Sequence, residues 1–228
     1  MGTVRWCERR DGSIPPPLED GLPGWIVDRD RASHLNARRV HGGREYHLKW
    51  FRHGPLRNPA RAEWRNVERI AALGLPTVAA VGWGRHRGGS FVVLEGSPGV
   101  PGDAWIRSGG RARDLRALAR ELAARVARMH DANLCHRDLN VYHVLVDGDA
   151  SRLIDVGRVI RFVRRRWVVK DLASLLASAR REGYPAWSAR LFLGGYLKAT
   201  RRRWNRRGII RAVARKAERI RRRLDRKQ

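Results

Sequence analysis

The chain has few cysteines, no long apolar run and few acidic residues. The first two shortages exclude classes of protein, and the third sets the charge of the chain. Its two cysteines, Cys7 and Cys135, are too few for a disulfide framework, which excludes a small disulfide-rich secreted protein. No apolar run approaches the ~18 residues of a membrane span, and the first residues lack the apolar core of a signal peptide. The sequence therefore predicts a reduced, cytoplasmic protein that is at most peripheral to a membrane.

The shortage of acidic residues makes the chain strongly basic. It has 49 Lys and Arg against 22 Asp and Glu, a net charge of +27, and +12 of this lies in residues 201–228. A field of this sign attracts nucleic acid, anionic lipid or phosphorylated glycan. Hydrophobic residues make up 43% of the chain, so a packed core is expected and global disorder is excluded.

The patterns before residue 98 predict a small strand-rich lobe with one helix. Residues 1–24 lack periodicity and contain several prolines, so they are expected to be irregular. The expected elements of the lobe, which spans residues 25–98, are a strand at 25–27, a hairpin over 35–51, a helix over 61–73, and strands at 78–83 and 90–95. A glycine and proline stretch, 96–99, then marks the boundary to the next lobe.

Residues 99–204 predict a mostly helical second lobe, and residues 205–228 a basic amphipathic helix. Helices are expected from Asp114 to about 130, from Asp171 to about 181, and over 186–199. Two interpretations of the last helix stay open. Its apolar side docks on the large lobe, or it lies on an anionic membrane with its isoleucines inserted.

Two aspartates lie next to short apolar runs in the second lobe. Asp138 follows His136 and Arg137 and precedes the apolar run 144–146, and Asp155 follows a second apolar pair. Acids at adjacent strand ends can place one carboxylate near a nucleophile and the other on a metal ion. Phosphoryl transfer needs that arrangement, because its catalysis is mostly positioning and charge neutralisation.

The order of elements resembles the protein-kinase-like fold. Lys49 on a strand and Glu63 on a helix precede these acids, and Asp171 on a helix follows them. The resemblance implies an α+β, bilobal protein. Lys49 would hold the ATP phosphates and Glu63 would fix Lys49 through an ion pair. Asp138 would orient the attacking hydroxyl and accept its proton, and Asp155 would bind Mg²⁺.

One departure from protein kinases indicates a particular family within this fold. His143 stands five residues after Asp138, where protein kinases carry asparagine. Together with the segments 63–65, 73–77, 153–155 and 170–172, this loop resembles that of the lipopolysaccharide core kinases, over roughly residues 35–180. Those enzymes phosphorylate Kdo or heptose of a bacterial glycolipid at the inner face of the inner membrane, using ATP and a divalent metal. The resemblance implies that this chain also uses ATP and Mg²⁺ and also works at the inner face of the inner membrane.

The resemblance leaves the metal ligands partly open. His143 and Asn140 are both candidates beside Asp155, since imidazole is a poorer Mg²⁺ ligand than oxygen. Asp171 would support the catalytic loop through backbone hydrogen bonds, with Arg137 in a structural role. Glu95, the last residue before the interlobe stretch, is included in the nucleotide-binding group.

Arginines that follow Asp155 would border the acceptor in a kinase-like fold. They are predicted to bind phosphates and carboxylates of an anionic glycolipid, although a solvated charge run is an equal alternative. The predicted acceptor group is Arg158, Arg161, Arg164, Arg165 and Arg166. An anionic membrane surface is a further expected partner, nucleic acid is not favoured, and a monomer is expected.

Two further departures concern the nucleotide and its control. Residues 28–40 contain no glycine, so no glycine-rich loop precedes Lys49. Val156 and Gly157 follow Asp155 in place of Phe-Gly, which predicts no activation-loop phosphorylation.

Two alternative functions remain. One is a small atypical protein kinase similar to the tRNA-modification-associated kinase, against which His143 counts. The other is a pseudokinase or basic scaffold for nucleic acid, against which Lys49, Asp138 and Asp155 count.

Overall fold

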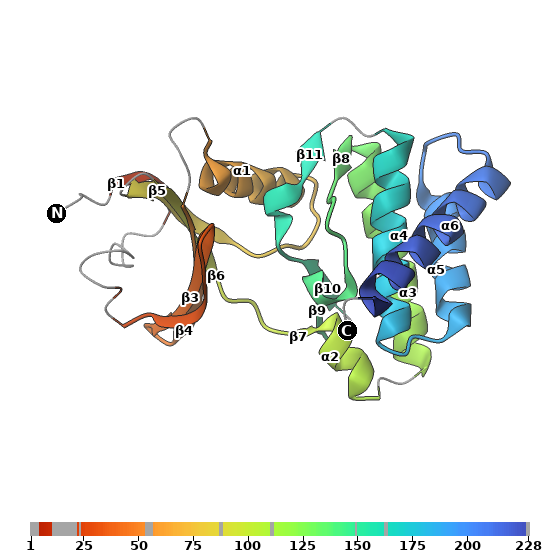
Figure 1. Cartoon of the computed structure of the whole chain (residues 1–228), viewed down its shortest axis with the longest axis horizontal. Helices are drawn as coiled ribbons and strands as arrows, with labels where there is room; N and C mark the ends of the chain where they lie inside the picture. Colours follow the sequence, from red (N-terminus) through yellow and green to blue (C-terminus); the bar gives the residue numbers. More distant parts are fainter. Residues whose placement is uncertain are drawn as a thin grey trace. The chain divides into compact units, whose positions relative to one another are not determined.

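The computed structural model describes residues 5–10, 22, 24–52, 57–86, 89–109, 112–148, 150–161 and 164–226. The chain divides into two compact units, the first made of Met1–Ala72 and Thr77–Ser97, the second of Leu73–Pro76 and Pro98–Gln228. Figure 1 shows that the first unit is strand-rich with one helix and that the second is mostly helical. The α+β class and the character of both parts are as predicted.

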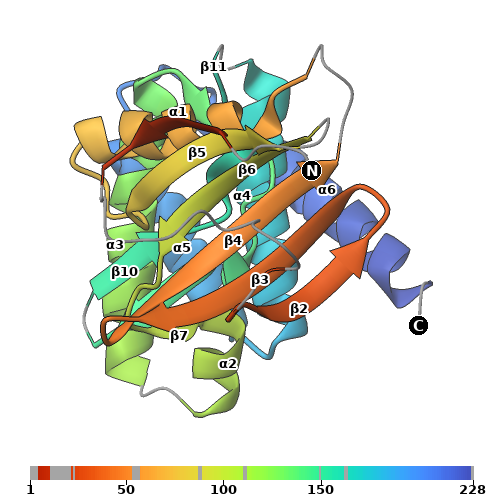
Figure 2. The same cartoon turned by 90° about the vertical axis from the view of Figure 1, so that its left-hand side faces the viewer.

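The first unit is an antiparallel sheet of six strands in the order β1-β5-β6-β4-β3-β2, seen face-on in Figure 2. The strands are β1 (Arg5–Arg9), β2 (Ile26–Arg31), β3 (His34–His41), β4 (Arg44–Arg52), β5 (Ala80–His86) and β6 (Gly89–Glu95). The predicted hairpin is β3–β4, which turns through Gly42 and Gly43 at positive φ. Alternation places Tyr46 and Leu48 of β4 in the core with Phe91, so Lys49, which directly follows Leu48, faces the other side of the sheet.

Strand β1 corrects the prediction that residues 1–24 are irregular; most of the remainder of that stretch lies outside the described residues. β1 pairs with β5, and Trp6 packs edge-on against Phe91 with ring centroids 5.0 Å apart. The partner strand makes room with a glycine, since a Cβ on Gly82 would lie 2.6 Å from the Trp6 ring. This pairing depends on a residue far along the chain, and the periodicity of residues 5–9 alone does not reveal it.

Helix α1 (Pro59–Ala72) begins and ends at residues suited to those positions. Asn58 caps its first turn, because its side-chain oxygen accepts the Arg61 N–H at 3.0 Å. Gly74, with φ of +64°, follows its last turn. Trp64 is buried with the other apolar residues of this helix, and Glu63 is buried beside it.

The second unit consists of helices around short strands. Its elements are β7 (Val100–Pro101), α2 (Gly102–Arg107), α3 (Ala112–Asp131), β8 (Leu134–Cys135), β9 (Val144–Asp147), β10 (Ala150–Leu153), β11 (Ile160–Arg161), α4 (Arg165–Arg181), α5 (Ala186–Ala199) and α6 (Arg206–Asp225). Single 3₁₀ turns precede β9, at Val141–His143, and β11, at Val156–Arg158. α3 packs on α5, and α4 on α6. The helix predicted from Asp171 begins earlier, at Arg165, and α2 was not predicted.

Helix α6 is a docking helix. Its first turn is capped by Asn205, whose side-chain oxygen accepts the Gly208 N–H at 2.8 Å. Along its apolar side Ile209 is 2% and Val213 0% exposed, and the helix packs on α4. The alternative in which the isoleucines enter a membrane is therefore wrong for Ile209, the buried anchor of the helix. Among the helices in the described part of the chain, none is long and apolar enough to cross a bilayer.

Neighbouring isoleucines on α6 test this docking. Ile209→Ala should lower the free energy of unfolding by about 2–4 kcal/mol, because it leaves a cavity under the helix. Ile210→Ala is the matched control, since Ile210 is 42% exposed; its effect should stay below about 1 kcal/mol. Urea unfolding of both variants measures the difference, and equal losses would contradict the docked arrangement.

Candidate active site

Lys49 and Glu63 form an ion pair within the first unit. Lys49 lies in the middle of β4, and its ammonium donates to Glu63 Oε1 of α1 at 2.6 Å. The Glu63 side chain is only 1% exposed, and that of Lys49 20%. A carboxylate this deeply buried is strongly unfavourable without a partner. The pair therefore holds the lysine side chain in one position.

Glu95, also predicted for the nucleotide, lies at the end of the neighbouring strand β6 and is not part of this pair. In the register of β4 and β6, Lys49 faces Val92 and Glu95 faces Tyr46, so Glu95 lies three residues further along. That is about 10 Å along the strand. Its carboxylate accepts from Arg44 at 3.3 Å.

In the second unit, Asp171 of α4 holds the turn that carries Asp138. Its two carboxylate oxygens accept the backbone N–H groups of His136 and Arg137, each at 2.7 Å. The ammonium of Lys170 donates to the Arg137 carbonyl, and burial lowers the pKa of this lysine. Arg137 has a left-handed backbone with φ of +65°, an unfavourable conformation for a side chain with a Cβ. These contacts to consecutive residues of α4 stabilise that conformation.

Two hydrogen bonds through Ile154 join this turn to the segment that carries Asp155. The Ile154 N–H donates to the His143 carbonyl at 3.0 Å, and the Ile154 carbonyl accepts from His136 Nε2 at 3.1 Å. Burial lowers the pKa of His136, which is therefore neutral at pH 7 and has a structural role. Asp155 is itself left-handed, with φ of +55°, and strain of this kind tends to concentrate at functional sites.

Asp138, His143 and Asp155 form an acidic cluster. One ligand atom of each lies within 4.8 Å of the others. His143 Nδ1 lies 2.7 Å from the Asp138 carbonyl, which can only accept, so Nδ1 carries a proton. The other ring nitrogen, Nε2, is 3.3 Å from Asp155 Oδ2. Two lone pairs at this distance repel each other unless a proton or a cation lies between them.

The cluster fits a divalent cation. Two carboxylates and an imidazole nitrogen with a free lone pair are a donor set suited to Mg²⁺ or Mn²⁺. Asn140 contributes differently, because its amide nitrogen donates to Asp138 Oδ1 at 3.0 Å and so orients that carboxylate.

Another group, His130, Cys135 and Asp171, is also close enough for a metal but does not fit one. Both Asp171 oxygens accept backbone N–H groups, and His130 Nδ1 is bonded to the Tyr196 hydroxyl at 3.0 Å. Burial raises the pKa of Cys135 to about 12, so its sulfur is a thiol and not the thiolate that binds metals. This buried group is structural.

Among the predicted acceptor arginines, Arg158 lies on the cluster. Its guanidinium is 3.4 Å from Asp138 Oδ2 and its side chain is 71% exposed. Arg161 is exposed on β11, and Arg164 is exposed just before α4. Within the described residues, no contact joins Arg161 or Arg164 to Asp138.

The next two arginines have partners of their own. Arg165 donates to the Gly208 carbonyl at 3.1 Å and so ties the start of α4 to the start of α6. Arg166 stacks on the Trp167 ring at 4.7 Å, and Arg137 stacks on the same ring at 4.6 Å.

Sequence reasoning missed the roles of Lys170, Trp167 and Tyr142. Lys170 directly precedes Asp171, but its link to the Arg137 carbonyl depends on the tertiary structure. Trp167 supports Arg137 by stacking, and Tyr142 lies edge-on to His143 with ring centroids 4.5 Å apart. Tyr142 is 46% exposed beside the cluster, and an exposed aromatic next to a catalytic loop is a signal that could have identified it.

The sequence profile of the lipopolysaccharide kinase (Kdo/WaaP) family matches residues 24–196 of the chain. The chain belongs to this family. It is 32% identical to the lipopolysaccharide core heptose(I) kinase WaaP of Pseudomonas aeruginosa over 183 residues, which cover 71% of this chain and 68% of that protein. The family resemblance found in the sequence is thereby confirmed.

Solved structures agree. A structure of WaaP in complex with acyl carrier protein superimposes with a TM-score of 0.68 and 30% identity, covering 85% of this chain and 87% of that one. An aminoglycoside-3'-phosphotransferase of type VIII shares the fold, with a TM-score of 0.55 and 22% identity over 84% of this chain and 93% of that one. This member of the Kdo/WaaP family therefore has a protein-kinase-like fold and is a phosphotransferase with an alcohol group as acceptor.

Proposed function

We propose that the protein transfers the γ-phosphate of ATP to a sugar hydroxyl, of Kdo or heptose, in the inner core of lipopolysaccharide. The observation that carries the proposal is the cluster of Asp138, His143 and Asp155 on a turn held by Asp171. The name of the relative from Pseudomonas aeruginosa, a core heptose kinase, indicates the class of acceptor.

In this proposal the ion pair of the first unit serves the nucleotide. Glu63 holds the Lys49 ammonium at 2.6 Å, which leaves the lysine positioned to bind phosphate oxygens of ATP. The conformational entropy of the lysine side chain is therefore lost when the unit folds, before the nucleotide binds. Glu95, at the end of β6, is the second residue of this unit proposed to contact ATP.

Asp138 orients the acceptor hydroxyl and takes its proton as the oxygen attacks the γ-phosphorus; the bond from that phosphorus to the bridging oxygen breaks, and ADP leaves. Asn140 holds one oxygen of this carboxylate by donating to Oδ1, so Oδ2 is the atom that accepts the proton. Arg158, which lies 3.4 Å from Oδ2, moves aside when the hydroxyl enters. A bound Mg²⁺ supplies neutralisation of the charge that develops on the transferred phosphate.

Between the two candidate ligands beside Asp155, the geometry favours His143. Its protonated Nδ1 is held by the Asp138 carbonyl, which turns the Nε2 lone pair toward Asp155. Asn140 instead directs its amide nitrogen at Asp138. In this proposal His143 binds the metal with Asp155, and Asn140 positions the base.

The acceptor is an anionic glycolipid, and exposed arginines bind its charged groups. Arg158, Arg161, Arg164 and Arg166 carry this role, because guanidinium pairs with phosphate and carboxylate through two parallel bonds. Arg165 does not belong to this group, since its guanidinium is bonded to Gly208. In this proposal the enzyme is a monomer, and it acts at the inner face of the inner membrane on a glycolipid acceptor.

A transfer assay tests the function. The protein is incubated with γ-labelled ATP, Mg²⁺ and either core glycolipid, a generic protein or no acceptor, and label is expected only in glycolipid. Asp138→Asn should lower turnover at least about 100-fold, because it removes the base. Asp147→Asn, at the end of β9 in the same unit, is the control and should keep activity. Label entering protein alone would reject the proposed acceptor.

Binding of Mn²⁺, measured by calorimetry without nucleotide, tests the metal ligands. His143→Ala should weaken binding about tenfold or more, because it removes a ligand. Asn140→Ala should change it less than about threefold, since Asn140 only orients Asp138. The opposite order of effects would assign the metal to Asn140, and a loss with Cys135→Ser would point to the buried group.

Kinetics separate acceptor binding from nucleotide binding. Replacing Arg164 and Arg166 with Ala should raise the acceptor KM about tenfold or more, because charge-assisted hydrogen bonds are lost. The KM for ATP should change less than about twofold. Arg113→Ala with Arg120→Ala, exposed on α3, is the matched control. Equal effects on both KM values would show that the arginines at the start of α4 do not contact the acceptor.

A further inference from the structure

Arginines gather on one side of α6, away from its buried apolar side. All six are exposed, and they are Arg211, Arg215, Arg219, Arg222, Arg223 and Arg226. At 3.6 residues per turn these positions fall within roughly one third of the helix circumference, and they extend over about 22 Å of its axis. We call these six residues the arginine face of α6.

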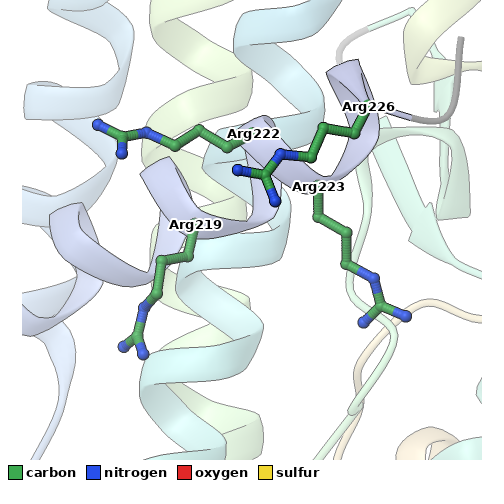
Figure 3. A pocket seen from close by; sticks show the side chains of 4 residues that line it. All are labelled: Arg219, Arg222, Arg223 and Arg226. Atoms are coloured by element: carbon green, nitrogen blue, oxygen red, sulfur yellow. The ribbon is translucent and has the colours of Figure 1, made fainter.

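The arginines on the last two turns of this face line an open hollow. Arg219, Arg222, Arg223 and Arg226 line a space of about 420 Å³, and Figure 3 shows their guanidinium groups spreading to either side of the helix. Guanidinium groups bind phosphate oxygens through paired N–H bonds. Because the four groups spread apart, they suit several phosphates side by side better than one small ion.

The charge of this hollow is largely uncompensated. Glu218 accepts from Arg221 at 2.7 Å and from Arg222 at 3.0 Å, and these contacts lower its pKa to about 2. Among the side chains that the structure describes, no carboxylate contacts Arg219, Arg223 or Arg226. Like charges three or four residues apart repel each other on a helix. An anion in the hollow would relieve that repulsion.

We propose that the arginine face of α6 docks the enzyme on the phosphate groups of an anionic phospholipid membrane. Burial of Ile209 and Val213, with the contact from Arg165 to Gly208, holds the helix on the second unit. The face is therefore a straight, firmly held row of charge, which matches a planar array of phosphates. Its six side chains are all charged, so attraction of charge drives binding, and each arginine near the surface strengthens it about fivefold.

The hollow is separate from the proposed acceptor residues Arg164 and Arg166. Arg165, which lies between them in the sequence, contacts the start of α6 at Gly208, whereas the hollow begins near Arg219, about 17 Å further along the helix axis. The inference rests on the proposed function in one respect, since a membrane-embedded acceptor is what makes docking useful. A surface that holds the enzyme on the bilayer would raise the local concentration of acceptor without contacting it.

The test compares two fourfold variants that lose the same charge. One replaces Arg219, Arg222, Arg223 and Arg226 with Gln. The control replaces four exposed arginines elsewhere, Arg29, Arg113, Arg120 and Arg203. Flotation measures partition onto phosphatidylcholine vesicles with and without phosphatidylglycerol, at low and high salt. Circular dichroism and thermal unfolding check that both variants fold.

Wild type should bind only the anionic vesicles and lose binding as salt rises. The α6 variant should bind at least tenfold more weakly and the control at most threefold more weakly. A third variant with Lys at the four α6 positions should recover binding to within about fivefold, since it restores the charge. Equal losses in the two Gln variants, or no loss in the α6 variant, would overturn the proposal.

Two further measurements separate this proposal from its alternatives. If the α6 variant loses binding to purified acyl carrier protein but keeps vesicle binding, the face serves a soluble protein and the proposal is wrong. With a water-soluble core oligosaccharide as acceptor, the α6 variant should turn over as wild type does. Wild type that phosphorylates no core sugar, yet binds vesicles through α6, would reject the proposed function and uphold the docking.

Discussion

The turn that carries Asp138 in the second unit depends on one buried carboxylate. Asp171, with its side chain 0% exposed, accepts two backbone N–H groups at 2.7 Å from the turn that carries Asp138. Charge-assisted bonds of this kind compensate the loss of hydration that burial imposes on an acid. They also set the position of the turn relative to α4. Because Ile154 bonds to both His136 and His143, the Asp155 segment is tied to the same anchor.

In the first unit a different kind of bond, an ion pair between side chains, positions Lys49. There the buried acid is Glu63, and its partner is the Lys49 side chain instead of backbone amides. The ion pair joins helix α1 to strand β4. Both devices lie within their own unit. Each arrangement is therefore ordered by the folding of its own unit. In the proposed function this matters, because phosphoryl transfer relies on preorganised charge more than on covalent chemistry.

The fold and the family could be predicted from the sequence, and the elements that were missed have physical causes. Lys49, Glu63, Asp138, Asp155 and Asp171 occur in a characteristic order, so the kinase-like fold and the family could be recognised, and both are confirmed. β1 was missed because its pairing needs Gly82 in a distant strand, and α2 because six residues are too few to show helical periodicity. The proposed choice between His143 and Asn140 depends on which side-chain atoms face Asp138 and Asp155, and no sequence pattern encodes that.

The left-handed backbone of Asp155 places a side chain with a Cβ at a position whose conformation suits glycine. A glycine there would adopt φ of +55° without steric strain. It would also remove a carboxylate from the cluster with Asp138 and His143. In the proposed function, the backbone conformation of position 155 therefore favours glycine, whereas its proposed chemistry requires a carboxylate.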